Sequence, residues 1–275
     1  MFKVEPLTGA IGGVVRGVDL CRPIDEAARE FLQTALLEHE VLFFRDQPMS
    51  PQSHVAFANL FGQPQLHEAY DHVNGYPQLT ILENDRDRPS KIELWHTDMT
   101  FRPCPPIGSI LHAVMIPEKG GDTLFASMSA AYEGLSAKMQ SLLSGLTAIH
   151  DFSYGFRESL DEPGGAERLA DMVAANPSVE HPVIRTHPVS GKKSIFVNAL
   201  FTVRIKGMQP KESRALLDFL YSHVTTPEYT CRFNWRPNSV AFWDNRITQH
   251  KPVNDYWPAH RKMQRITIDD GRPPV

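Results

Sequence analysis

The fold of this chain is limited most by a series of short apolar runs that glycine and proline separate. The runs are rich in β-branched and aromatic residues, and 22 prolines in 275 residues punctuate them. Such runs predict short β-strands, because branched side chains pack well on a pleated surface and proline interrupts its hydrogen bonds. The expected strands lie at residues 41–44, 107–116, 123–126, 148–152, 182–186, 194–197, 229–235, 239–243 and 265–268.

Helical spacing separates several of these strands. Apolar residues three and four positions apart predict helices at residues 23–40, 51–61, 127–143, 167–175 and 209–223, and residues 2–18 predict a hairpin. No repeat, low-complexity tract or linker divides the chain, so residues 1–275 are expected to form a single domain. We therefore predict a mainly β fold with helical insertions, a sandwich or barrel such as a jelly roll. Distant segments would converge at the mouth of such a fold.

The segment 94–101 carries the first chemical signal. His96 and Asp98 are separated by one residue, so an extended backbone would point both side chains the same way. This pair can bind a metal ion from one side, and His250 in the segment 243–250 offers a third ligand. Two histidines and one carboxylate on one face leave the opposite positions open, which suits non-haem Fe(II) and O2 chemistry.

The His-x-Asp pair is a weak signal when it stands alone. It occurs by chance in many chains as a surface pair or a cap, and 12 histidines make a distal histidine easy to find. Arg261 and Arg265 add to it, because residues four apart share a face of a strand or a helix. Their guanidinium groups match a carboxylate or a sulfonate through paired hydrogen bonds. A solvated basic segment would explain both arginines too, but their position just after His250 favours anion binding.

Composition narrows the function classes. A net charge of -4 gives no reason to expect nucleic acid or an anionic membrane as a partner. The cysteines Cys21, Cys104 and Cys231 form no C-x-x-C motif, which argues against a disulfide framework or a zinc knuckle. The first residues lack the apolar core of a signal peptide, and no apolar run reaches membrane-spanning length. We expect a cytoplasmic protein.

Five motifs in register give a far more specific signal, and it spans essentially the whole chain. They are WHTD at 95–98, GGDT at 120–123, THPVSG at 186–191, FVN at 196–198 and WDNRITQH at 243–250. The chain resembles the TauD/TfdA family of Fe(II)- and 2-oxoglutarate-dependent dioxygenases, and among its members most resembles the taurine dioxygenases. The resemblance implies a double-stranded β-helix (jelly-roll) core and a homo-oligomer, either a dimer or a tetramer.

The resemblance also implies roles for individual residues. Iron would be bound by His96, Asp98 and His250, with Trp243 beside it. Thr123 and Arg261 would bind the distal carboxylate of the cosubstrate 2-oxoglutarate. The remaining positions would bind substrate: His67 and Arg265 its sulfonate, with Tyr70, Phe101, Phe156 and Phe201 lining the pocket. By themselves, Thr123 and the lone loop residue His67 indicate no function.

The implied reaction uses O2 to hydroxylate the carbon next to sulfur in taurine or a related small sulfonate. It releases sulfite and an aldehyde, while 2-oxoglutarate becomes succinate and CO2. Ile92 and Gly155 depart from the taurine pattern, which has asparagine and serine near the substrate amine. An alkylsulfatase or an aryloxyalkanoate dioxygenase of the same family therefore stays open. A non-catalytic jelly-roll protein that binds metal or anions, and a zinc hydrolase, are weaker alternatives.

Overall fold

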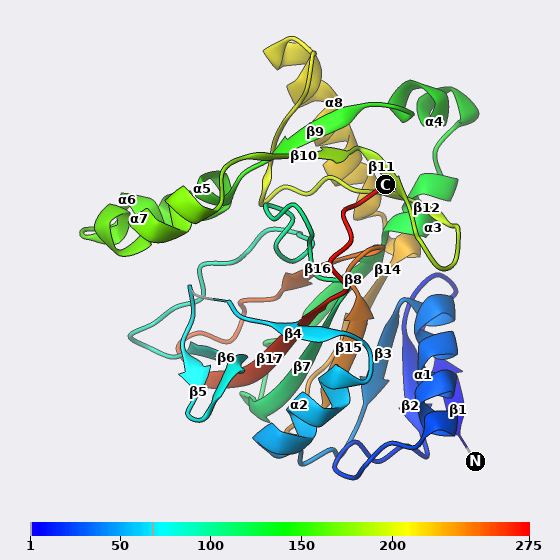
Figure 1. Ribbon diagram of the computed structural model, residues 1–275, viewed down its shortest axis with the longest axis vertical. Coiled ribbons are helices and arrows are strands. Elements are labelled where there is room, and N and C mark those ends of the chain that lie inside the picture. Colours follow the sequence, from blue (N-terminus) through cyan, green and yellow to red (C-terminus); the bar gives the residue numbers. More distant parts are fainter. Residues whose placement is uncertain (1, 68) are drawn as a thin grey trace.

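Strand pairing between distant segments builds one large sheet in the computed structural model, which describes residues 2–67 and 69–275. The strand order is β1-β2-β3-β15-β7-β17-β6-β5, with β4 paired to the end of β17 (Figure 1). The strands are β1 (Lys3–Pro6), β2 (Gly13–Arg16), β3 (Val41–Phe44), β4 (Gln63–Gln65), β5 (His72–Val73), β6 (Tyr76–Asn84), β7 (Gly108–Met115), β15 (Val240–Asp244) and β17 (Arg261–Asp269). The pairs that flank β15 and β17 are antiparallel.

A second, smaller sheet faces the large one across a buried aromatic layer. Its order is β14-β8-β16, from β8 (Thr123–Ser127), β14 (Thr230–Phe233) and β16 (Thr248–Pro252). Trp243 of β15 packs in this layer with Phe125 and Phe233 of the small sheet. Neighbouring Phe242 points to the opposite face, because strand side chains alternate. Both faces of β15 are thus buried, which explains why the strand is a continuous apolar run.

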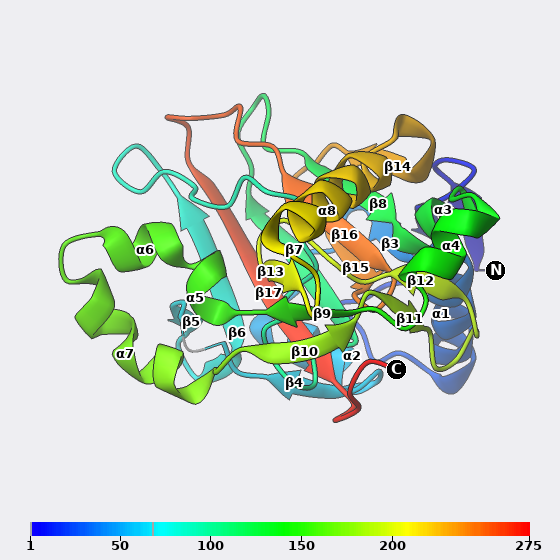
Figure 2. The same ribbon diagram turned by 90° about the horizontal axis from the view of Figure 1, so that it is seen from above.

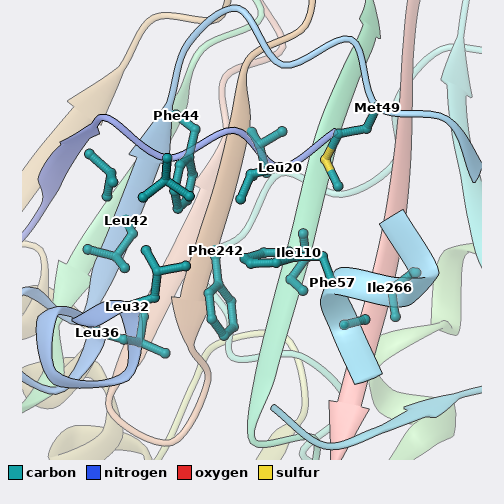
Figure 3. Close-up of a cluster of buried hydrophobic side chains, with 14 of the residues drawn as sticks. Leu20, Leu32, Leu36, Leu42, Phe44, Met49, Phe57, Ile110, Phe242 and Ile266 are labelled. Carbon is teal, nitrogen blue, oxygen red and sulfur yellow. The ribbon is translucent and has the colours of Figure 1, made fainter. Parts of the chain in front are cut away.

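Two helices cover the outer face of the large sheet. They are α1 (Glu26–His39), which Asp25 caps by accepting a hydrogen bond from the Ala28 N–H, and α2 (Pro51–Asn59), which Ser50 caps in the same way. Figure 3 shows their side chains meeting those of the sheet in one cluster, among them Leu32, Leu36, Phe57, Ile110, Phe242 and Ile266. This packing leaves the inner face of the large sheet free to build the site.

The remaining elements form a lobe beside the two sheets. It holds α3 (Met128–Glu133), α4 (Ala137–Leu143), β9 (Thr147–His150), β10 (Val179–Pro182), β11 (Ile184–Thr186), β12 (Lys193–Ile195), β13 (Thr202–Ile205), α8 (Pro210–Val224) and the short helix η1 (Pro227–Tyr229). Between β9 and β10, the chain forms α5 (Phe152–Gly155), α6 (Arg157–Asp161) and α7 (Gly165–Ala175), which project from the body in both views (Figures 1 and 2). Within the described residues, no helix is long and apolar enough to cross a membrane.

The predicted fold class is confirmed, and the differences concern individual elements. The single helix expected at 127–143 is wrong: α3 ends at Glu133 with Gly134 as its C-cap, and Ser136 caps a separate helix α4. The strand expected at 182–186 is divided between β10 and β11, and Phe152 begins a helix rather than ending a strand. The sequence did not predict β6, β13 or β16. Their residues are largely polar or half-buried, so pairing with neighbouring strands defines them more than their own pattern does.

Candidate metal centre and anion-binding arginines

Backbone pairing places His96 directly beside His250. The N–H of His96 donates to the carbonyl of His250 at 3.0 Å, and the reverse bond measures 2.8 Å. Residues opposed in this way project their side chains from the same face, and the two ring centroids are 4.2 Å apart. The Thr97 hydroxyl donates to the carbonyl of Thr248 and holds the two segments in register. Two histidines far apart in the sequence thus converge.

The backbone of Asp98 is held by a single amide side chain. Asn245 Oδ1 accepts a hydrogen bond from the Asp98 N–H at 2.9 Å, and its Nδ2 donates to the carbonyls of Asp98 and Pro106 at 3.0 and 2.9 Å. Next in the chain, Met99 has a φ of 52°, so the backbone turns sharply after Asp98. The extended geometry expected for the pair therefore ends at Asp98, and Asn245 fixes its position instead.

Two donors hold the carboxylate of Asp98. Ser109 Oγ donates to Oδ2 at 2.7 Å, and Arg265 Nη1 donates to Oδ1 at 2.8 Å. One potential ligand atom from each of His96, Asp98 and His250 lies within 4.8 Å of the other two. The structure thus brings the three residues that the sequence singled out into one buried cluster.

The protonation states of these groups suit a divalent metal. Burial, and then the neighbouring imidazole, lower the pKa of His250 to about 3, and burial also lowers the pKa of His96. Burial alone would raise the pKa of Asp98, but Arg265 and the two imidazoles hold it well below its usual value. His96 Nδ1 contacts the carbonyl of Leu94 at 2.9 Å, so Nδ1 carries the proton and Nε2 is available as a ligand. Two neutral imidazoles and one carboxylate fit Fe(II).

Arg261 and Arg265 project from the same face of β17, as the spacing predicted, and both are buried. Arg265 pairs with Asp98, whereas Arg261 forms no ion pair with any described residue. The Arg261 guanidinium lies 5.8 Å from the centre of the Tyr256 ring, and its Nε is buried without a hydrogen-bond partner. A buried cation without a counter-ion is costly, so a ligand carboxylate would be favoured there.

The glycine motif lies against Arg261. Gly121 has a φ of +73°, and a Cβ added to it would lie 3.3 Å from Cδ and Nε of Arg261. Thr123, two residues further on, accepts a hydrogen bond from Trp235 Nε1 at 2.9 Å. The structure therefore places Thr123 on the segment that packs on Arg261. The sequence did not single out Trp235, which bonds Thr123, or Tyr256, whose ring lies near Arg261.

A second group of residues surrounds the free side of Arg265. The rings of His67 and Tyr70 are 4.7 Å apart, and the Arg265 guanidinium is 5.9 Å from the centre of the Tyr70 ring. Burial, followed by Arg265 and Arg102, lowers the pKa of His67 to about 3, so its imidazole is neutral. The Nδ1 of His67 and the Nε of Arg265 are buried without partners. These unused polar atoms could bind the oxygens of a sulfonate.

A cluster of aromatic rings lies beside the segment that carries Asp98. Phe101 lies 5.1 Å from Phe201 and 6.4 Å from Phe156, between ring centroids, and Phe152 stacks on Phe156 at 4.4 Å. The apolar cluster that they form also includes Ile92, Met99 and Ala69. A Cβ added to Gly155 would overlap the ring of Phe201. The space that a side chain at residue 155 would need is therefore filled by this ring.

Sequence reasoning missed several residues that shape the site. Asn245 lies inside the motif at 243–250, but its type alone does not show that it clamps Asp98. Ser109 is a small polar residue within a buried apolar strand, which is a detectable signal. Phe152 was assigned to a strand, so its place beside Phe156 could not be foreseen. Trp243, expected near the metal, has its ring 4.8 Å from that of His250.

Comparisons with known proteins match almost the whole chain to one family of dioxygenases. The family model described as taurine catabolism dioxygenase TauD, TfdA family matches residues 3–267. An alkylsulfatase from Acinetobacter baylyi is 38% identical over 271 residues, which cover 97% of this chain and 84% of the relative. An alpha-ketoglutarate-dependent sulfate ester dioxygenase from Pseudomonas putida is 38% identical over 278 residues, covering 100% and 91%. A solved taurine dioxygenase from Burkholderia xenovorans has a TM-score of 0.84 at 36% identity, covering 100% and 95%.

Proposed function

Because this chain belongs to the TauD/TfdA family of Fe(II)- and 2-oxoglutarate-dependent dioxygenases, we propose that it oxidises an organosulfur anion that has an apolar body. The oxidised carbon is the one next to the sulfonate or the sulfate-ester group. The observation that carries this proposal is that two different groups adjoin Asp98. Arg265, which lies near Tyr70 and His67, bonds the Asp98 carboxylate, and we call this side the polar end. The cluster of aromatic and aliphatic side chains that includes Met99, the residue after Asp98, is the apolar end.

The cofactor and the cosubstrate are assigned to residues that fit them. His96, Asp98 and His250 hold Fe(II), and Arg261 with Thr123 binds the distal carboxylate of 2-oxoglutarate. The bound iron supplies the coupling of O2 reduction and 2-oxoglutarate decarboxylation to hydroxylation of a substrate C–H bond. Ser109 and Arg265 keep Asp98 ionised and oriented through the two hydrogen bonds to its carboxylate. Asn245 keeps its backbone in place.

The anionic group of the substrate is assigned to Arg265. Its Nη1 is used by Asp98, but its planar guanidinium carries further donors, and Nε is buried without a partner. His67 is neutral and buried beside it, so it can donate one N–H without bringing a second positive charge. The reacting carbon is bonded at a fixed offset from the anionic group, so holding that group places the carbon beside the metal ligands. Positioning, more than acid–base chemistry, is the task of these residues.

The apolar end favours an alkyl sulfate or an alkanesulfonate over taurine. Ile92 and the Phe201 ring, which packs on Gly155, are apolar where an ammonium group would need acceptors. Burying an ammonium there without partners would be costly.

Hydroxylation next to a sulfate-ester oxygen gives an unstable hydroxy sulfate that splits into an aldehyde and sulfate. A sulfonate would release sulfite instead. The alkylsulfatase and the sulfate ester dioxygenase among the relatives support this choice.

A substrate panel tests the proposal. The iron-loaded protein would be assayed for 2-oxoglutarate consumption and for sulfate or sulfite release with hexyl sulfate, hexanesulfonate, taurine and phenoxyacetate. We expect the two hexyl compounds to have the highest kcat/KM, and the Asp98→Ala variant gives the background without substrate oxidation. Taurine as the best substrate would contradict the role of the apolar end. Turnover of phenoxyacetate alone would move the assignment to carboxylate substrates, and no turnover at all would favour a binding protein.

A further inference from the structure

The junction between α1 and β3 carries a buried carboxyl group that the site described above does not use. Glu40 ends α1 in the left-handed region, with a φ of 63°, and only 1% of its surface is exposed. Glycine is the usual residue in this conformation, because it has no Cβ to clash with the backbone. A buried glutamate held in a strained conformation indicates that its side chain has a task.

The backbone of Glu40 holds the beginning of the motif at 243–250. Its carbonyl accepts a hydrogen bond from the N–H of Asp244 at 2.9 Å, where the pairing of β3 with β15 ends. The next residue, Asn245, has the side chain that bonds the N–H and the carbonyl of Asp98. One hydrogen bond, one peptide bond and one amide side chain therefore join Glu40 to a candidate metal ligand.

The carboxyl group of Glu40 meets groups from two further segments, which lie beside the end of α1 in Figure 1. At the start of α3, the Ser129 hydroxyl donates to Oε1, and the Ser127 hydroxyl lies 3.2 Å from that of Ser129. In the turn between β11 and β12, Lys192 has its Nζ 3.8 Å from Oε1, and its side chain is 37% exposed. The other oxygen of Glu40, Oε2, is buried without a hydrogen-bond partner.

Glu40 shares this junction with a second buried carboxyl group. The Asp244 carboxylate is bound by Arg246 at 2.6 and 2.9 Å and contacts His187 Nε2 at 3.0 Å, so its charge is compensated. Within residues 2–67 and 69–275, the carboxyl group of Glu40 forms an ion pair with Lys192 alone. A negative charge on Glu40 would be weakly compensated and would be repelled by Asp244.

The protonation state of Glu40 changes near neutral pH. Burial raises the pKa of Glu40 to about 7, and the hydroxyls of Ser129 and Ser127 and the charge of Lys192 oppose this shift only in part. The group is therefore mainly a neutral acid at pH values below about 7 and mainly a carboxylate above it.

We propose that Glu40 is a positioning residue for the candidate metal centre, which keeps Asn245 on Asp98 when it is neutral and loosens this hold when it ionises. An ionised Glu40 is repelled by Asp244 and attracted by Lys192, and both forces act on the Glu40–Asp244 backbone bond that precedes Asn245. The metal centre should therefore bind its ion more weakly as the pH rises through neutrality. Histidine ligands have the opposite trend, because protons compete with a metal for imidazole.

Co(II) titrations of the full chain at several pH values test this inference, which rests on the metal centre of the proposed function but not on its substrate. Visible absorption measures the affinity for Co(II), and the wild type should lose about threefold to tenfold between about pH 6 and pH 8. Glu40→Gln keeps the shape of the neutral acid and should bind Co(II) equally across this range. Glu38→Gln changes an exposed glutamate of the same helix and should keep the wild-type profile.

A second variant keeps the test decisive if Glu40→Gln does not fold. Lys192→Gln removes the counter-charge of Glu40 from a partly exposed side chain, so the loss of affinity should move to higher pH. An unchanged midpoint in Lys192→Gln would count against Glu40 as the titrating group.

Three other outcomes would overturn the inference. A wild-type affinity for Co(II) that does not fall with pH, or a fall that Glu40→Gln retains, would remove the role of Glu40 and leave the metal centre intact. Weaker binding by the same factor at every pH in Glu40→Gln would show that its role is purely structural. A wild type that binds no Co(II) at any of these pH values would contradict the metal centre, and with it both the proposed function and this inference.

Discussion

The two ends of the proposed substrate pocket are built in different ways. At the polar end, directed hydrogen bonds fix each group: Ser109 and Arg265 hold the Asp98 carboxylate at 2.7 and 2.8 Å. At the apolar end, the rings of Phe101 and Phe201 contact each other by packing, with their centroids 5.1 Å apart. Directed bonds tolerate little change, whereas packing tolerates substitutions that conserve volume. We therefore expect substitutions at the polar end to be costly, and substitutions that conserve volume at the apolar end to be tolerated.

A buried polar network joins the two ends. Thr100 stands between Asp98 and Phe101, and its hydroxyl accepts a hydrogen bond from Asn198 Nδ2 at 3.0 Å. Asn198 Oδ1 in turn accepts from the N–H of Phe201 at 2.9 Å. One amide thus links the segment of the metal ligand to a ring of the apolar end. Substitutions in this network should change both metal binding at the polar end and substrate preference at the apolar end. Substitutions at either end should change only the property of that end.

The largest effect is expected from Asp98→Ala. The variant loses the carboxylate ligand and leaves Arg265 buried without its partner, so kcat/KM should fall at least about 1,000-fold, or roughly 4 kcal/mol. Consumption of 2-oxoglutarate and equilibrium Fe(II) binding measure it. The control is Ser109→Ala, which removes one hydrogen bond from the same carboxylate and should reduce activity only a few-fold. Turnover near the wild-type value would remove Asp98 from the ligand set.

The joining network should make folding sensitive to acid. Burial lowers the pKa of His181 to about 4, although its contacts with the carbonyls of Arg102 and Thr100 oppose this shift. Between the ordinary histidine pKa of about 6.5 and pH 4, the unfolded chain takes up a proton that the folded chain refuses. Stability from this group is therefore complete above pH 6.5 and is lost as the pH falls, by roughly 3 kcal/mol at pH 4.

Urea unfolding of the iron-free protein at several pH values between 7 and 4 measures this loss. His181→Gln should be less stable at pH 7 and should lose roughly 3 kcal/mol less than the wild type on acidification. The exposed His260 lies outside this network, and His260→Gln provides the control for the loss of a histidine. Parallel profiles for wild type and His181→Gln would show that His181 protonates equally in both states.

A smaller effect should separate the two arginines of the polar end. Arg261→Ala should raise the 2-oxoglutarate concentration needed for half-maximal rate roughly 30-fold, about 2 kcal/mol, because a buried charge pair with the cosubstrate is lost. The KM for the organosulfur substrate should change much less. Arg232→Ala is the matched control, since Arg232 pairs with Asp122 of the same glycine motif and is half exposed. The opposite ranking of the two KM values would exchange the roles of Arg261 and Arg265.

The polar residues of the candidate site were easier to single out from the sequence than the packing of the apolar residues, for a physical reason. His96, Asp98, His250 and the arginines have chemical types that are rare in a protein interior, so their motifs indicate their role. The structure confirms that the three ligand candidates converge. The same motifs do not show that β16 is a strand, because its polar sequence is ordered by pairing with β8. Phe152 and Ser109 likewise gain their positions from tertiary contacts.

Gly155 illustrates what sequence comparison could not reach. The residue type shows a departure from the taurine dioxygenase pattern, but a missing side chain does not reveal what fills its place. The Phe201 ring fills it, from a segment that follows β12, and Asn198 holds the backbone of that ring. We therefore expect substrate specificity at this end to depend on Gly155 and Phe201 together, and not on Gly155 alone.

A double-mutant cycle on this pair is the finest test of the comparison. Gly155→Ser should lower kcat/KM for hexyl sulfate about tenfold, because the added side chain displaces the Phe201 ring into the pocket. Phe201→Ala makes room, so the double variant should be better than the product of the two single effects, with a coupling of about 1.4 kcal/mol. Fe(II) binding should stay unchanged in all three variants, because Asp98 keeps its partners. Simple additivity would show that the two positions act independently. A loss of Fe(II) affinity would show that the apolar end is not separable from the metal centre.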